Sequence, residues 1–90
     1  MAVKAIPDGY HNITPYLVVK GGAKAIAYYT SVFGAKEFVR MPGEKDGEIG
    51  HAELKIGDSV VMLADETSEH RGPESVGGTT VTLLLYVEDV

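Results

Sequence analysis

The stretch EIGHAELKIGDSVVMLA, residues 48–64, decides the fold of this chain. Its first part, residues 48–56, alternates between apolar and polar side chains, which predicts a β-strand with one buried face. The apolar face carries Ala52, Leu54 and Ile56, and the polar face carries His51, Glu53 and Lys55. Gly57 and Asp58 predict a two-residue type II′ turn, because glycine favours the first central position of that turn. Residues 59–64 then return as a second strand, and the whole stretch predicts a β-hairpin.

Toward the N-terminus, a third strand is expected at residues 36–41, before Pro42. Residues 23–33 carry a helical apolar stripe, with Ile26, Tyr29 and Phe33 at i, i+3 and i+7, and Ala25 and Val32 between them. Gly34 follows at the position where a helix end favours a left-handed residue. Residues 11–19 alternate like a strand, and Pro15 places that strand at an edge or at a bulge. The predicted order is therefore β-α-β-β-β.

Toward the C-terminus, residues 65–78 form a polar, acidic loop, which is long for a compact domain. Residues 79–87, TTVTLLLYV, are nearly all apolar or β-branched and predict a strand covered on both faces. The run TLLLYVEDV resembles the earlier TPYLVVKGG, where a strand precedes a helix. We therefore expect residues 1–64 to form one module, residues 65–78 to link, and residues 79–90 to begin a second, incomplete module.

The length and composition exclude several classes of protein. Ninety residues and 9.6 kDa allow one small domain. The net charge of −5, from 13 acidic and 8 basic residues, argues against nucleic acid or an anionic membrane as the partner. There is no cysteine for a disulfide or a thiolate zinc site. With no apolar run of ~20 residues and no signal-peptide core at the start, we expect a cytoplasmic protein.

Three phrases of the sequence carry a family resemblance. They are YHNITPYLVVKGGAKAIAYYTSVFGAKEFVRMP, GHAELKIGDSVVMLADE and GGTTVTLLLYVEDV. Together they resemble the glyoxalase/bleomycin-resistance/extradiol-dioxygenase superfamily, also called vicinal oxygen chelate, and within it the PhnB-like branch, whose members often carry 3-demethylubiquinone methyltransferase names. The resemblance implies an α+β fold: a βαβββ module with one extra strand, forming a cup-shaped mixed sheet with its helix on the convex face. It also implies a small-molecule cavity that a second module completes.

In metal-using members of this superfamily, the ligands come from cup-facing positions of the first and fourth strands of each module. The resemblance places these positions at Thr14 and Met62, and at Thr82 in the incomplete second module. Threonine and methionine are not usual ligands of the divalent metals involved, which prefer imidazole and carboxylate groups. This departure disfavours a metal site, and we expect no cofactor.

His51 and Glu53 are the strongest remaining candidates for a functional pair. At i and i+2 of one strand they project from the same face, with Cβ atoms ~6–7 Å apart. Three readings stay open: a solvated polar face, a ligand contact, or a general base or metal site. Tyr16 shares the cup-facing side with Thr14, whereas His11 and His70 are expected to be solvated. The predicted ligand-binding residues are Thr14, Tyr16, His51, Glu53 and Met62.

Three functions compete at this point. The first is a metal-independent protein that binds a small molecule in its cup, which a second copy completes as a homodimer or by strand exchange. The second is a metal-dependent lyase, isomerase or dioxygenase that recruits His51, Glu53 or a partner chain. The third is an inactive half of a two-module protein, with an apolar face that favours association. We rank the first highest, and the third is compatible with it.

Overall fold

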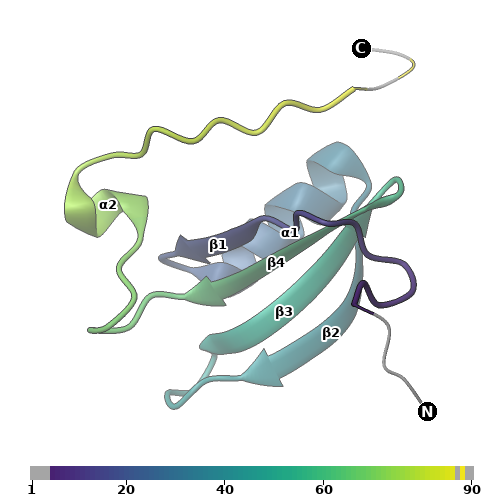
Figure 1. The fold of residues 1–90 in the computed structure, drawn as a ribbon. Helices are drawn as coiled ribbons and strands as arrows, with labels where there is room; N and C mark the ends of the chain where they lie inside the picture. The colour runs from purple at the N-terminus through teal and green to yellow at the C-terminus, as the bar shows by residue number, and fades with distance from the viewer. Residues whose placement is uncertain (1–4, 87, 89–90) are drawn as a thin grey trace.

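The computed structural model describes residues 5–86 and 88. Within them the chain forms one mixed sheet, a long helix and a short helix (Figure 1). The elements are β1 (Tyr16–Val19), α1 (Gly22–Phe33), β2 (Lys36–Pro42), β3 (Ile49–Ile56), β4 (Ser59–Asp65) and α2 (Pro73–Val76). The predicted β-α-β-β-β order and the α+β class are confirmed.

The sheet has the strand order β1-β4-β3-β2. β1 runs parallel to β4, whereas β3 pairs antiparallel with both of its neighbours, β4 and β2. The register pairs Ile56 with Ser59, so the hairpin loop is the predicted two residues long. Gly57 has φ +61°, the left-handed conformation that glycine adopts without a steric penalty. The hairpin prediction is therefore confirmed. In the sheet order, the parallel strand β1 lies at one edge.

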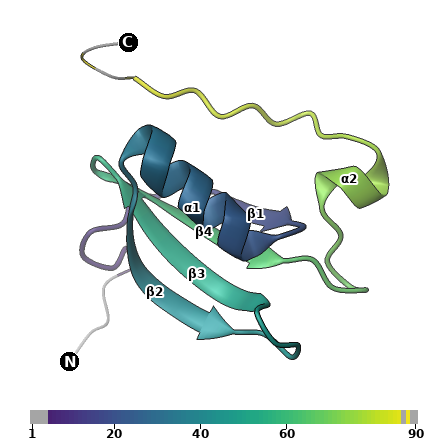
Figure 2. The same cartoon turned by 180° about the vertical axis from the view of Figure 1, so that it is seen from behind.

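The helix α1 packs across one face of the sheet, as the two opposite views show (Figures 1 and 2). Ala52, Leu54 and Leu63 have no exposed surface beneath it, and Ile26 is 4% exposed. The helix ends at Gly34, whose left-handed conformation lets its N–H group bond to the carbonyl of Tyr29. These contacts confirm the alternation read from residues 48–56.

The last turn of α1 differs from the prediction. Val32 and Phe33 were expected on the buried stripe, but they are 53% and 40% exposed. The Phe33 ring instead stacks on Tyr29, with ring centroids 5.8 Å apart, and meets Tyr28 edge-on. The apolar period predicts which side of the helix is buried, but the neighbouring elements decide how far along the helix the burial extends.

The first strand is shorter than the predicted residues 11–19. The structure assigns only Tyr16–Val19 to β1, although the Pro15 carbonyl accepts a bond from the Met62 N–H at 2.9 Å. Proline has no N–H group to donate, so the ladder stops there, at the edge position that Pro15 predicted. Thr14 therefore lies just before the strand and is half-buried.

Residues 79–86 differ most from the prediction. They run without pairing to any described strand, apart from the sheet in both views (Figures 1 and 2), and all eight are exposed. Tyr86 is 90% exposed and Leu84 is 73% exposed. A strand exists only where a neighbour supplies a ladder of N–H and C=O groups, and no described residue supplies one here. Val87, the last residue of the predicted strand, lies outside the described residues.

None of the helices in the described part of the chain has the length and apolar character needed to cross a membrane.

Candidate functional site

The face of the sheet opposite α1, the open face, carries most of the predicted ligand-binding residues. The register pairs Tyr16 with Met62, and Met62 with Glu53, so these three form one row across β1, β4 and β3. Residues paired in this way project from the same face of a sheet. His51 shares this face because it lies two residues before Glu53. The structure thus brings together four of the five predicted residues, and Thr14 lies just outside the row.

A chain of hydrogen bonds, the polar chain, joins four side chains on the open face. The Tyr16 hydroxyl lies 3.0 Å from Nδ1 of His51, and Nε2 of His51 lies 2.9 Å from Oε2 of Glu53. The Tyr10 hydroxyl donates to Oε1 of Glu53. The exposed fraction of the side chains falls along the polar chain from Tyr16 to Glu53. Tyr16 is half-exposed, whereas the His51 and Glu53 side chains are 24% and 12% exposed. Tyr16 is therefore the member most open to a ligand.

Tyr10 is the member that sequence reasoning missed. It belongs to the segment before β1, and residues 8–10 line a small pocket with Lys55 and Val60 of the open face. No local pattern indicates this contact, since 43 residues separate Tyr10 from Glu53. Only the path of the segment across the sheet brings the two groups together.

The hydrogen bonds fix the charge state of the carboxylate. Bonds from Tyr10 and then from His51 hold the pKa of Glu53 below its usual range, against burial, which raises it. The same bond to Glu53 raises the pKa of the Tyr10 hydroxyl. Glu53 is therefore an acceptor at neutral pH, so Nε2 of His51 must carry the proton that it donates. In the neutral ring, Nδ1 then accepts the proton of Tyr16.

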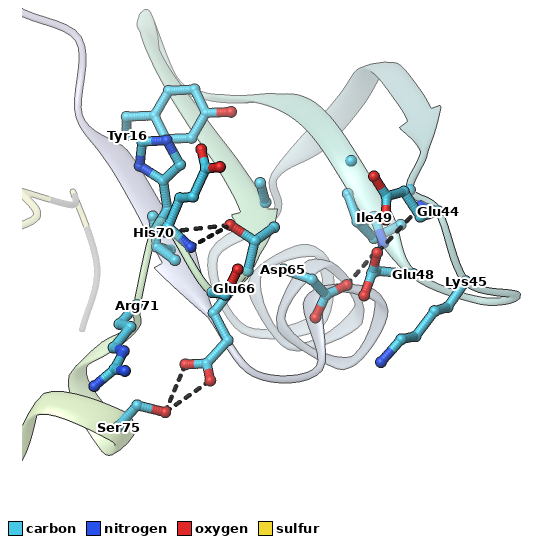
Figure 3. Close-up of a pocket in the computed structure, with 17 residues that line it drawn as sticks. Tyr16, Glu44, Lys45, Glu48, Ile49, Asp65, Glu66, His70, Arg71 and Ser75 are labelled. Atoms are coloured by element: carbon cyan, nitrogen blue, oxygen red, sulfur yellow. Dashed lines mark hydrogen bonds between the residues drawn. The ribbon is translucent and has the colours of Figure 1, made fainter.

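An open groove with a volume of about 1240 Å³ adjoins the polar chain. Tyr16 and Val18 of β1 and Ala64 of β4 form part of its wall. Loop residues close its two sides, as the close-up shows (Figure 3). The ionisable side chains among them are Glu44, Lys45 and Glu48 from the β2–β3 loop, and Glu66, Glu69, His70 and Arg71 from the segment after β4. Part of the predicted loop at residues 65–78 is thus a wall of the groove.

Two carboxylates at the end of β4 hold these walls in place. Asp65 accepts the N–H groups of Gly21 and Gly22 at 2.9 and 2.8 Å through Oδ1, and that of Ile49 at 2.7 Å through Oδ2. It therefore caps the start of α1 from a different element, because glycine at the helix N-cap supplies no side chain. This role was missed, since Asp65 appears in the sequence as the first residue of a loop.

Glu66 anchors the opposite wall. It accepts the Gly72 N–H at 2.9 Å. It also accepts the Ser75 hydroxyl at 2.7 Å (Figure 3). The bonds from Ser75 and then from Gly72 hold the pKa of Glu66 below its usual range. Gly72 is buried, and a Cβ atom there would lie 2.8 Å from the Val18 carbonyl oxygen. The loop is therefore fastened against β1.

The comparisons with known proteins agree with this architecture. Residues 9–90 match the family described as the Glyoxalase/Bleomycin resistance protein/Dioxygenase superfamily. The chain belongs to this superfamily.

Relatives of this glyoxalase-superfamily chain include two mycobacterial proteins. It is 43% identical over 83 residues to the uncharacterized protein Mb0911c of Mycobacterium bovis and to the uncharacterized protein Rv0887c of Mycobacterium tuberculosis. The match covers 87% of this chain, but 54% and 48% of the two relatives. The chain thus spans about half the length of the curated relatives it matches.

A solved structure supports the fold. The crystal structure of TioX from Micromonospora sp. ML1 aligns with a TM-score of 0.54 and 24% identity, over 64% of this chain and 44% of TioX. This likeness concerns the fold alone.

The residues at the superfamily's metal positions do not fit a divalent cation. Met62 lies on the open face, and Thr14 lies before β1. A thioether and a hydroxyl are poor ligands for the hard or borderline metals in question. Across residues 5–86 and 88, no three His, Asp or Glu side chains come close enough to hold a metal ion together. His51 and Glu53 are bonded to each other and to the two tyrosines.

Proposed function

We propose that this chain binds a small molecule on the open face of its sheet without a metal, and that a second copy completes the cup. The observation that carries this proposal is the polar chain, whose Tyr16 end lines the 1240 Å³ groove. Metal-dependent chemistry has no comparable support, because the donors at the expected positions do not suit it. We also propose that, within the superfamily, the chain belongs to the PhnB-like branch.

The polar chain favours a ligand contact over a merely solvated face. Side chains that only face water need no common network, whereas here three separate segments contribute to one. Apolar residues surround the network: Met62 lies within its row, and Val18 and Ala64 line the adjoining groove. Convergent polar groups beside apolar wall residues are typical of small-molecule sites, and the many polar loop side chains that line this groove favour a polar ligand.

Completion by a second copy rests on two unpartnered features. The strand β1 ends the sheet order, so no described strand pairs with its outer edge, where Gly72 of the loop lies against the Val18 carbonyl. Residues 79–86 expose Val81, Leu83, Leu84 and Tyr86, between 51% and 90% each. Exposed apolar patches and free strand edges both favour association between chains. Homodimerisation or strand exchange would cover both features.

Binding can be tested by a fragment screen followed by backbone amide NMR shifts, in buffer that contains EDTA. We expect saturable shifts that cluster at Tyr16, His51 and Glu53. Tyr16→Phe should weaken binding several-fold, whereas the matched control Tyr28→Phe should not, because Tyr28 is similarly exposed but lies on α1 across the sheet. Shifts confined to α1 would contradict the proposal. Shifts that require added divalent metal would favour the metal-dependent alternative.

Completion can be tested by native mass spectrometry. We expect a dimer of the 9.6 kDa chain, and Leu84→Asp should convert it to monomer by placing a charge in the contact. Val76→Asp is the control, since Val76 is an exposed apolar residue of α2, outside residues 79–86. A wild-type chain that stays monomeric while it binds fragments would refute completion by a second copy and leave the binding proposal standing.

A further inference from the structure

In the polar chain, the two hydrogen bonds of His51 point the same way, from Tyr16 to His51 and from His51 to Glu53. This order of donors and acceptors restricts the class of ligand that fits. We propose that the ligand carries a weakly acidic hydroxyl group, as a phenol or an enol does, and that it binds as its anion after giving its proton to His51 through Tyr16. This inference rests on the proposed function, because it concerns the same site.

The first step is the arrangement of protons before a ligand arrives. Nε2–H of His51 donates to Glu53, so Nδ1 accepts the Tyr16 proton across 3.0 Å. With its own proton directed at Nδ1, the Tyr16 oxygen presents only lone pairs to the groove. A hydroxyl donor on the ligand complements this oxygen, whereas an anion that arrives already charged would meet lone pairs.

The second step is the proton transfer itself. The ligand's O–H bond breaks as its proton moves to the Tyr16 oxygen, and the Tyr16 O–H bond breaks as that proton moves to Nδ1 of His51. Each bonding electron pair stays on its oxygen, so no oxidant or reductant is needed. The products are a ligand oxyanion that accepts a hydrogen bond from Tyr16, and an imidazolium whose two N–H groups bond to Tyr16 and Glu53.

The third step is the charge balance that makes this transfer favourable. The positive charge on His51 lies beside the Glu53 carboxylate, which is 12% exposed and already bonded to Tyr10. In the register, β2 places the uncharged Met41 beside His51, and β4 places Met62 beside Glu53. The hydrogen bond between the imidazolium and the carboxylate is electrostatically stronger in such a part-buried network than in water.

Other ionisable groups lie around the network. Lys55 shares the open face two residues beyond Glu53, paired across to Lys36 of β2, and Asp8 lines the small pocket with both lysines. Glu44, Lys45, Glu48, Asp65, Glu66, Glu69, His70 and Arg71 line the groove. Among the described residues, no lysine or arginine is bonded to the polar chain. The proton on His51 is therefore the cation that the network itself provides for the ligand anion.

A phenol close to imidazole in acidity is the best probe, since proton transfer between matched groups responds most to its surroundings. The test uses 4-nitrophenol, whose anion has its own visible absorption band, and 4-nitroanisole, which has the same shape without the acidic proton. Each is titrated into the wild-type chain across about pH 6–8, so that the pKa of bound 4-nitrophenol is read from its anion band and compared with that of the free phenol. The side-chain NMR signals of His51 are followed in parallel.

We expect bound 4-nitrophenol to show the anion band, with its pKa lowered by about one unit or more. At the upper end of this pH range, where a free imidazole is neutral, the His51 signals should move to the imidazolium position with 4-nitrophenol but not with 4-nitroanisole. Tyr16→Phe and His51→Gln should both abolish the anion band. The controls Tyr28→Phe and His11→Gln should keep it, because both residues are exposed and lie outside the polar chain.

The two proposals fail in different ways. If both probes bind on the open face but 4-nitrophenol stays neutral, the acid–base inference is overturned and small-molecule binding stands. If the anion band forms equally well in Tyr16→Phe, the route through Tyr16 is overturned. If neither probe binds saturably on the open face, the acid–base inference falls, and a fragment screen without hits there removes the binding proposal as well.

Discussion

The Asp65 carboxylate gives the sharpest test of how this fold is held together. It accepts three backbone N–H groups, from Gly21 and Gly22 at the start of α1 and from Ile49 at the start of β3. Replacement by asparagine keeps the shape but turns one of the two oxygens into an NH₂ donor. Whichever way the amide turns, that donor faces an N–H group: either Ile49 or the two glycines lose their acceptor.

The magnitude follows from the number of bonds lost. Hydrogen bonds to charged groups contribute about 1.5–3 kcal/mol each, and a carboxylate at a helix N-terminus adds up to about 1 kcal/mol. We expect Asp65→Asn to lower the free energy of unfolding by about 2–4 kcal/mol, because Asp65 is half-buried and water replaces part of the loss. A 90-residue domain has about 5–13 kcal/mol in total, so this single change removes a large share.

The assay is urea unfolding followed by circular dichroism. With a denaturant slope of about 1–2 kcal/mol/M, the midpoint should fall by roughly 2 M. The control is Asp46→Asn, the same change in the exposed β2–β3 loop, which should stay within about 0.5 kcal/mol of wild type. An Asp65→Asn midpoint equal to that of Asp46→Asn would refute the idea that this carboxylate joins α1 to the sheet.

Two further predictions concern the open face and the groove wall. The lowered pKa of Glu53 means that the unfolded chain binds this proton first as the pH falls, so its stabilising effect is present at neutral pH and is lost below about pH 4. We expect the free energy of unfolding, measured in urea at neutral pH and below about pH 4, to depend less on pH in Glu53→Gln than in wild type. An unchanged pH dependence would contradict this. The control Glu69→Gln, at an exposed side chain, should behave like wild type. Gly72→Ala should loosen residues 66–76 from β1, because its Cβ would lie 2.8 Å from the Val18 carbonyl oxygen. Limited proteolysis should then cut this loop faster than in wild type or in the Ser68→Ala control, and equal rates would show that the loop is not fastened there.

Much of the module could be predicted from the sequence because its signals are local. Alternation over residues 48–56 and the Gly57-Asp58 pair are enough to predict a hairpin, since both depend on neighbours in the chain. The alternation also predicts that His51 and Glu53 share a face. It cannot predict that Tyr16 and Tyr10 complete their network, because those residues are 35 and 43 positions away.

The last segment shows the opposite case. Residues 79–86 have strong β-propensity, yet they form no ladder with the described strands. A propensity belongs to the residues themselves, whereas a strand also requires a partner edge at the right place. The segment thus has the apolar composition of a strand, but its leucines are exposed and not buried as predicted.

The sequence by itself determined the order of elements, the hairpin, the face that α1 covers and the superfamily resemblance, because these depend on short-range periodicity and on turn chemistry. Only the tertiary structure decided that β1 runs beside β4, that Tyr10 and Tyr16 meet the His51–Glu53 pair, and that Asp65 caps a helix more than 40 residues away. These contacts join distant segments whose approach is set by packing of the whole sheet, and no local pattern encodes them.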